Sequence, residues 1–267
     1  MRLGYIDYLN CYPFYHDMFE KQALKNVRIT AGHPSALNRM IRDNRLDMSP
    51  VSSASCPGMM DDICLSGDFC LSSVGYVRSV ILASKLPIED LHKKKVGLSS
   101  ASHTSVVLLK ILLKKYYDIQ PEYVESSPEL NLEQIDAQLV IGNEALKKFK
   151  NPPPYIYDLG DLWLRKTSYP VVFAVFALNK EWKAGHEEEI TQVKESFKRS
   201  LNLLHHEKGD LVASAKKKYP DIAFDISMYY DLLKFEFTDE LKKGLHFYYL
   251  SAAEAGFLDP VRHVSFF

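Results

Sequence analysis

Short apolar segments that end in polar turns and lead into helical segments recur along this chain, and this repeat constrains its fold more than any other feature. The first apolar segment, Leu3 to Ile6, runs into a turn that holds Asp7 and Asn10, and a helical segment follows Pro13. The later segments of this kind are 27–31, 46–51, 94–100 and 137–141. Because strands that alternate with helices favour parallel pairing, the sequence predicts an α/β protein with mainly parallel sheets and flanking helices.

Two further apolar segments, 79–84 and 171–177, bracket a middle section with the size of a small domain. We therefore predict two lobes joined by two crossings. Residues 1–84 and 175–267 are expected to form lobe 1, and residues 85–174 are expected to form lobe 2. Ligands in such α/β proteins bind outside the carboxyl ends of strands, so the ligand cleft is expected between the lobes.

The charge and hydropathy of the chain exclude several classes of partner. Its 267 residues carry 33 basic and 34 acidic side chains, so no broad field favours nucleic acid or an anionic membrane. No apolar run approaches the ~20 residues that cross a bilayer. The chain leads directly into a strand without the features of a secretory leader, so we expect a cytoplasmic location. An anionic ligand must then be held by a local set of donors.

The four cysteines, which are Cys11, Cys56, Cys64 and Cys70, match none of the usual zinc or redox spacings. We expect reduced, buried thiols and no metal, with a zinc site built from Cys56, Cys64 and Cys70 as the alternative. The chain also has no GxSxG, P-loop, HExxH or GxGxxG motif.

Polar side chains gather in the turns that follow the predicted strands, namely Asn10, Ser52, Ser53, Ser100, Ser102, Thr104 and Asn143. In "SSASHTSVV" the hydroxyls stand at the predicted start of a helix, where unpaired N–H groups and the helix dipole can hold a carboxylate or a phosphate. The alternative is plain helix capping, which also applies to Asn143 and to Ser35. The number of such turns favours an anion site.

Groups that transfer protons are scarce near these turns. His103 is a candidate, although its place at a helix N-terminus lowers its pKa, and Asp7 is the nearest carboxylate. Both residues have ordinary structural alternatives, as solvated or capping groups. His205 and His206 fall late in an amphipathic helix and are expected to be solvated or packed. The predicted cleft is therefore rich in neutral donors and poor in bases.

With these residues in view, the chain resembles the chorismate dehydratase family of the futalosine route to menaquinone. The motifs that carry the resemblance are "GYIDYLNCYPF", "HPSALNRMI", "LDMSPVSSASC", "SVGYVRSVILAS", "LSSASHTSVVLLKILL", "DAQLVIGNEAL" and "YDLGDLWLRKTSYPVVFAVFA". The resemblance implies a fold like that of type 2 periplasmic binding proteins. It also implies a lyase that removes water from chorismate, without metal or organic cofactor, to give 3-[(1-carboxyvinyl)oxy]benzoate.

The resemblance implies roles for particular residues. Asn10 and Ser79 fall on positions that look like active-site residues, with Asn10 near the leaving hydroxyl and Ser79 orienting substrate or handling a proton. The expected substrate-binding residues are Ser52, Ser53, Ser102, Thr104, Ser105 and Asn143. Because no strong protein base is available, we hypothesise that the side-chain carboxylate of the substrate takes the ring proton. Two departures from the family, at Asn143 and at Thr167 to Pro170, bear on substrate preference.

The sequence is also compatible with two other classes of function. A ligand-binding protein of a transporter or sensor would share the architecture without chemistry, although the missing leader argues against the transporter. A related menaquinone-pathway lyase that forms a dihydroxynaphthoate shares the fold, but the "YLNC" segment (8–11) favours the dehydratase. A purely structural protein would not need polar turns at so many strand ends.

Overall fold

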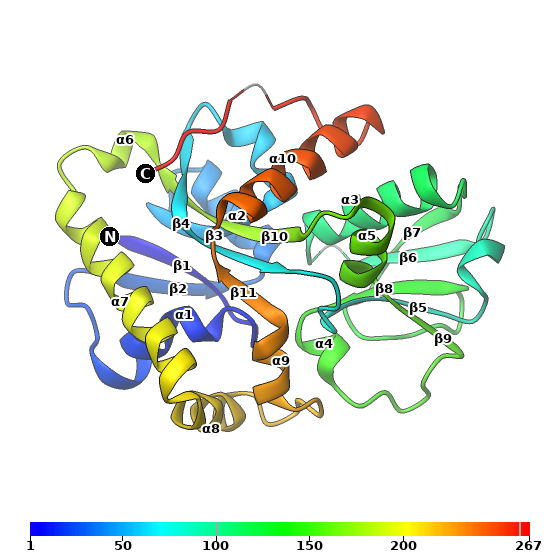
Figure 1. Cartoon of the computed structure of the whole chain (residues 1–267), viewed down its shortest axis with the longest axis horizontal. Helices are drawn as coiled ribbons and strands as arrows, with labels where there is room; N and C mark the ends of the chain where they lie inside the picture. The colour runs from blue at the N-terminus through cyan, green and yellow to red at the C-terminus, as the bar shows by residue number, and fades with distance from the viewer. Residues whose placement is uncertain (100, 262) are drawn as a thin grey trace.

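The computed structural model describes residues 1–99, 101–261 and 263–267. Two lobes lie side by side, each built around one β-sheet (Figure 1). The strands are β1 (Arg2–Ile6), β2 (Arg28–Gly32), β3 (Met48–Ser52), β4 (Ile63–Ser73), β5 (Val80–Ser84), β6 (Lys95–Ser99), β7 (Glu122–Ser126), β8 (Ala137–Ile141), β9 (Tyr155–Asp158), β10 (Val171–Asn179) and β11 (Leu233–Glu236).

Helices flank both sheets. The α-helices are α1 (Tyr12–His16), α2 (Pro34–Arg42), α3 (His103–Ile111), α4 (Asn143–Leu146), α5 (Leu159–Thr167), α6 (Lys180–Lys183), α7 (Glu187–His206), α8 (Lys208–Lys218), α9 (Ile226–Leu232) and α10 (Asp239–Glu254). Short 3₁₀ segments are η2 (Ser53–Ser55), η3 (Pro57–Met59) and η4 (Ile88–Asp90), and π-helical segments are η1 (Asp17–Lys21) and η5 (Leu112–Tyr116). None of the described helices combines the length and the apolar character needed to cross a membrane.

The sheets are mixed, so the expectation of mainly parallel sheets is wrong. The first sheet has the order β11-β4-β10-β3-β1-β2, and the second has the order β7-β6-β8-β5-β9. In the first, β1 is parallel to β2 and β3, whereas β10 is antiparallel to β3 and β4. In the second, β5 is antiparallel to β8 and β9. The reason is that β5 and β10 each begin where the chain crosses between lobes, so they run away from the cleft while β3 and β8 end at it.

The sheet pairings place the first crossing at residues 74–79 and the second between β9 and β10, within residues 159–170. All of β5 pairs within the second sheet and all of β10 pairs within the first. The expected boundaries after residues 84 and 174 therefore fall later than the crossings. Every residue of β5 and β10 is buried, so their apolar patterns carry no information about which sheet each strand joins.

An aromatic core fixes the first strand-to-helix turn. Phe14 from α1 packs 4.8 Å from Phe176 and 5.3 Å from Phe197, measured between ring centroids. Each of these three side chains is at most 1% exposed, and burial of a phenylalanine contributes about 1.5–3 kcal/mol. The turn that carries Asn10 is therefore anchored on both sides, by β1 in the sheet and by α1 in the core.

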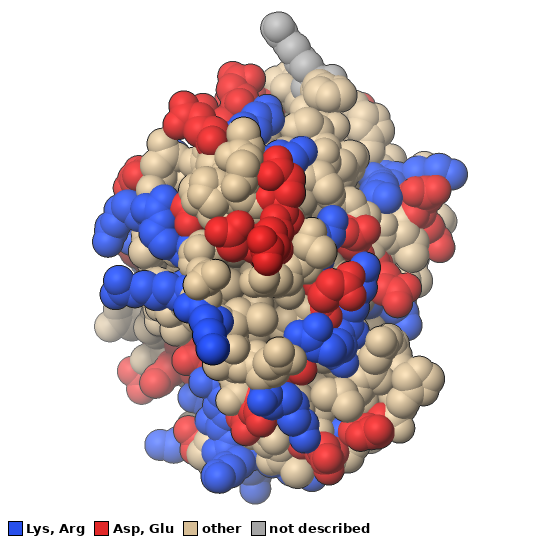
Figure 2. Space-filling view, turned by 90° about the vertical axis from the view of Figure 1, so that its left-hand side faces the viewer, with Lys and Arg blue, Asp and Glu red and all other residues tan. Residues whose placement is uncertain are grey.

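Charged side chains of both signs share one face of the molecule, and the cysteines are buried as expected. Figure 2 shows acidic and basic side chains interspersed over the face of the first lobe that carries α6 and α7. All four cysteines are buried and free of disulfides. Among the described residues, no cluster of His, Cys, Asp or Glu has the geometry of a metal site.

Candidate active site

A small cavity, with a volume of about 40 Å³, lies where turns from both lobes meet. Its polar lining consists of Tyr8, Asn10, Ser52, Ser79, Ser102 and Ser105. These side chains come from the end of β1, the end of β3, the crossing before β5 and the start of α3.

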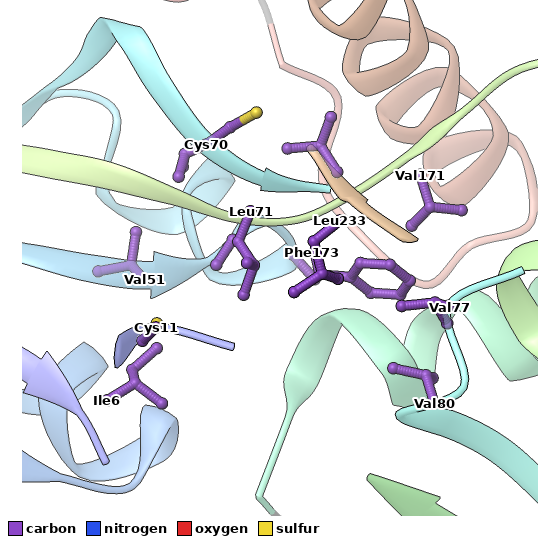
Figure 3. Close-up of a cluster of buried hydrophobic side chains, with 14 of the residues drawn as sticks. Ile6, Cys11, Val51, Cys70, Leu71, Val77, Val80, Val171, Phe173 and Leu233 are labelled. Carbon is purple, nitrogen blue, oxygen red and sulfur yellow. The ribbon is translucent and has the colours of Figure 1, made fainter. Parts of the chain in front are cut away.

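Apolar side chains form the rest of the wall. Figure 3 shows Phe173 of β10 beside Val77 of the crossing, with Val80 of β5 on the same side of the space and Ile6 of β1 across from them. These four residues and Leu71 all line the cavity. A flat apolar ring that carries polar groups at its rim would match this combination of walls and donors.

Asn10 is held in the turn between β1 and α1 by bonds to its neighbours. The Leu9 N–H donates to Asn143 Oδ1 at 2.9 Å, and Tyr230 donates its hydroxyl to the Leu9 carbonyl at 3.2 Å. The Asn10 Oδ1 atom is buried and has no hydrogen-bond partner within the described chain. Because a buried polar atom without a partner is costly, this oxygen is available to a ligand.

Ser79 is oriented by a residue that the sequence analysis missed, Tyr229. The Tyr229 hydroxyl, from α9 in the first lobe, donates to Ser79 Oγ at 2.8 Å. The Ser79 carbonyl accepts from the Gly142 N–H at 2.7 Å. Because its oxygen already accepts from Tyr229, the Ser79 hydroxyl is free to donate into the cavity.

Burial raises the pKa of Tyr229, against smaller opposing effects from the neighbouring side chains of Ser79 and Asn10. The phenol therefore stays protonated and remains a donor. No local sequence signal marks Tyr229, since it is one of many aromatic residues in the helical second half of the chain.

Ser102 and Ser105 stand at the N-terminus of α3. Ser102 is the N-cap, and its Oγ accepts from the Ser105 N–H at 3.3 Å. The two Oγ atoms lie 3.0 Å apart. Both side chains line the cavity while they cap the helix, so capping and ligand binding are compatible here. Ser52 also reaches the cavity, at the end of β3.

Three residues expected to bind substrate make protein contacts instead. Ser53 donates to the Val172 carbonyl at 2.7 Å. Thr104 donates to the Phe173 carbonyl at 2.8 Å and accepts from the Ala54 N–H at 3.1 Å. Asn143 uses its oxygen on Leu9. None of the three lines the cavity, and Ser100 lies outside the described residues.

The polar lining is uncharged. Among the described lining residues the one titratable side chain is Tyr8, and burial, with a smaller contribution from Glu144, raises its pKa to about 12. Asp7 points elsewhere, since it accepts from the Tyr219 hydroxyl at 2.8 Å and pairs with Lys218 at 3.3 Å. His103 lines a neighbouring groove, with Nδ1 3.2 Å from Ser55 Oγ.

The fold defines the class of protein as periplasmic-binding-protein-like. A protein from Archaeoglobus fulgidus matches it with a TM-score of 0.76 at 16% identity, over 96% of this chain and 98% of that one. The alkanesulfonate-binding protein SsuA from Xanthomonas axonopodis pv. citri, bound to MOPS, matches with a TM-score of 0.68 at 12% identity, over 98% of this chain and 96% of that one. At these identities the likeness shows the fold alone, and it confirms the predicted two-lobed α/β fold like that of periplasmic binding proteins.

The family follows from the sequence. A sequence model described as menaquinone biosynthesis matches residues 1–254. The chorismate dehydratase of Thermus thermophilus is 32% identical over 196 residues, which cover 67% of this chain and 70% of that protein. The chorismate dehydratase of Campylobacter jejuni is 26% identical over 184 residues, which cover 66% of this chain and 67% of that protein. The chain therefore belongs to the menaquinone-biosynthesis family.

Proposed function

We propose that this protein is a chorismate dehydratase, a hydro-lyase that converts chorismate into 3-[(1-carboxyvinyl)oxy]benzoate and water. The observation that carries the proposal is the uncharged cavity between the lobes, with apolar walls and a rim of hydroxyl and amide groups. The family and its named relatives supply the substrate.

The reaction does not require a strong base from the protein. The ring of chorismate loses a hydroxyl from one carbon and a hydrogen from the neighbouring carbon, and the electrons of the broken C–H bond complete an aromatic ring. Because aromaticity drives the elimination, the protein has mainly to orient the substrate and to stabilise the charge that develops.

The geometry supports a role for each polar group. Ser102, Ser105 and the N-terminus of α3 hold the ring carboxylate. Ser79 donates to the leaving hydroxyl or to the side-chain carboxylate, and Asn10 hydrogen bonds near the leaving hydroxyl. No described carboxylate, imidazole or amine lines the cavity, so the side-chain carboxylate of the substrate removes the ring proton. The four free, buried thiols support a reducing compartment, and we place the enzyme in the cytoplasm.

The test is to incubate the purified protein with chorismate and to follow the product by absorbance and mass spectrometry. We expect an aromatic product that has lost one water. A binding protein of the same fold would return chorismate unchanged while still binding it, and that result would refute the proposal. The matched variant is Asn10→Ala, which removes the unpartnered amide oxygen from the cavity and is expected to lower turnover by about 10²-fold or more.

A further inference from the structure

A groove that joins the two lobes runs beside the cavity, on the side where α2 faces α3. The first lobe contributes Arg39 and Arg42 from α2, and the second contributes His103 and Lys110 from α3 and Glu125 from β7. Ser102 lines both the groove and the cavity, so the two spaces adjoin at the N-terminus of α3. We refer to this surface, defined by Arg39, Arg42, His103 and Lys110, as the basic groove.

The cations of the basic groove have no carboxylate partner within the described chain. Arg39, Arg42 and Lys110 take part in none of the described ion pairs, and both arginines are exposed. Lys110 Nζ lies 5.0 Å from the centroid of the Tyr123 ring, and both residues line the groove. Glu125 is the one carboxylate among the described lining residues.

Cations from both lobes affect the pKa of the same groove residue, His103. Partial burial lowers the pKa of His103, and Lys110 and Arg42 lower it further from opposite sides of the groove. His103 is therefore neutral at pH 7, and three permanent cations face one carboxylate. This local charge stands out, because the whole chain has a net charge of −1 and the described lining of the cavity holds no cation.

We propose that the basic groove captures the dianionic ring substrate and passes it by Ser102 into the neutral cavity. This inference rests on the proposed function, which supplies a substrate with two carboxylates. A groove lined by one sign of charge raises the local concentration of an oppositely charged ligand and its association rate. The groove attracts the charged substrate through solvent. The cavity contains no cation among its described lining residues, and a cation there would hold the substrate carboxylate away from the ring proton.

The test compares charge variants at two ionic strengths. We expect the triple variant Arg39→Gln, Arg42→Gln and Lys110→Gln to lose about tenfold in kcat/KM for chorismate at low salt, with kcat unchanged. At about 0.5 M salt, where screening is nearly complete, the variant and the wild type should differ by less than about twofold. Glu125→Gln removes the one described carboxylate of the groove and should raise kcat/KM at low salt. The matched control is Arg28→Gln, Lys216→Gln and Lys217→Gln, three exposed cations outside the groove, which should behave as the wild type.

A second readout separates this inference from the proposed function. Isophthalate, an unreactive aromatic dicarboxylate, is titrated by calorimetry into the same variants, with benzoate as the singly charged comparison. We expect the groove variant to bind isophthalate more weakly than the wild type does, and to lose less affinity for benzoate. This result should hold whether or not chorismate is turned over. Equal salt dependence of the wild type and the groove variant in both assays, or an equal loss in the control variant, would overturn the capture role while leaving the dehydratase activity intact.

Discussion

The hydroxyl of Ser79 is a donor into the cavity because a phenol from another part of the chain occupies its oxygen. Tyr229 is 1% exposed and belongs to α9, more than a hundred residues away in sequence. A serine left alone rotates its hydroxyl towards any acceptor, including its own backbone. The Tyr229 contact removes that freedom before a ligand arrives, which is the preorganisation that electrostatic catalysis needs.

At this residue scale we predict that Tyr229→Phe lowers kcat for chorismate by about tenfold or more and leaves KM nearly unchanged. The substitution keeps the ring packing and removes the proton donated to Ser79. Steady-state kinetics measure the effect. Tyr15→Phe is the matched control, since Tyr15 is 0% exposed, its hydroxyl bonds to the Gly4 carbonyl, and neither residue lines the cavity. If both variants lose the same activity, Tyr229 is structural and has no positioning role.

The neutral character of the cavity leads to a second prediction, for Asn10→Asp. A carboxylate at this position faces a dianion in a space with little water, so repulsion should raise KM by about tenfold or more while the fold remains intact. The comparison with Asn10→Ala separates lost hydrogen bonding from added charge. Tighter binding of chorismate by the aspartate variant would contradict the assignment of Asn10 to the substrate side of the cavity.

The pH dependence of kcat is the third prediction at this scale. The pKa of Tyr8 is raised to about 12, so its phenol stays neutral until strongly alkaline pH, and the pKa of His103 is lowered, so its imidazole is neutral at and above pH 7. Neither group changes charge between about pH 7 and 9, and kcat should be flat over that range. A bell-shaped profile that His103→Ala removes would return the role of the base to the protein.

At the scale of elements, the cleft is made by two kinds of strand. Strands such as β1, β3 and β8 end at the cleft and deliver their following turns to it, whereas β5 and β10 begin there. The tight turn at Gly142 follows β8, which ends at the cleft, and it is hydrogen bonded to Ser79, which immediately precedes β5. The φ of Gly142 is +61°, and an added Cβ would lie 2.9 Å from the Tyr8 ring.

Gly142→Ala should therefore destabilise the fold by about 1–3 kcal/mol and lower turnover, because it strains the turn and displaces Tyr8. Thermal unfolding and kcat/KM measure the two effects. Gly185→Ala is the control for backbone strain alone, since Gly185 has φ +80° and open space around it. Turnover by Gly142→Ala equal to that of Gly185→Ala would show that Tyr8 can move without consequence.

At the scale of the whole molecule, hydrogen bonds span the two lobes and fix their arrangement. Asn143 in the second lobe accepts from Leu9 in the first, and Thr104 joins Ala54 and Phe173 in the same way. Asn143 and Thr104 do not line the cavity, yet their bonds set the distance between its walls. A ligand that bridges the walls should shift the population of lobe arrangements towards this one.

Asn143→Ala should favour an open form and weaken substrate binding by about fivefold, the equivalent of one neutral hydrogen bond. Small-angle scattering should show a larger radius of gyration for the variant without ligand and compaction when ligand is added. The control is Asn131→Ala, whose side chain bonds to Glu133 within the second lobe. An unchanged radius of gyration in Asn143→Ala would remove this bond from the closing mechanism.

The sequence by itself determined which segments are strands that end in polar turns, because apolar runs, prolines and caps act over a few residues. Asn10, Ser52, Ser102 and the helix that begins at Pro34 follow from such local signals. The neutrality of the site is likewise visible in the sequence, as a shortage of bases near those turns.

Only the tertiary structure decided which hydroxyls face the ligand. Ser52 and Ser53 are neighbours with the same chemistry, yet only Ser52 faces the cavity, because the Val172 carbonyl takes the hydroxyl of Ser53. Tyr229 and the basic groove depend on helices that are distant in the chain and meet only when the lobes pack. The direction of β5 and β10 was also beyond the sequence, since uniform burial leaves no pattern from which to assign a strand to a sheet.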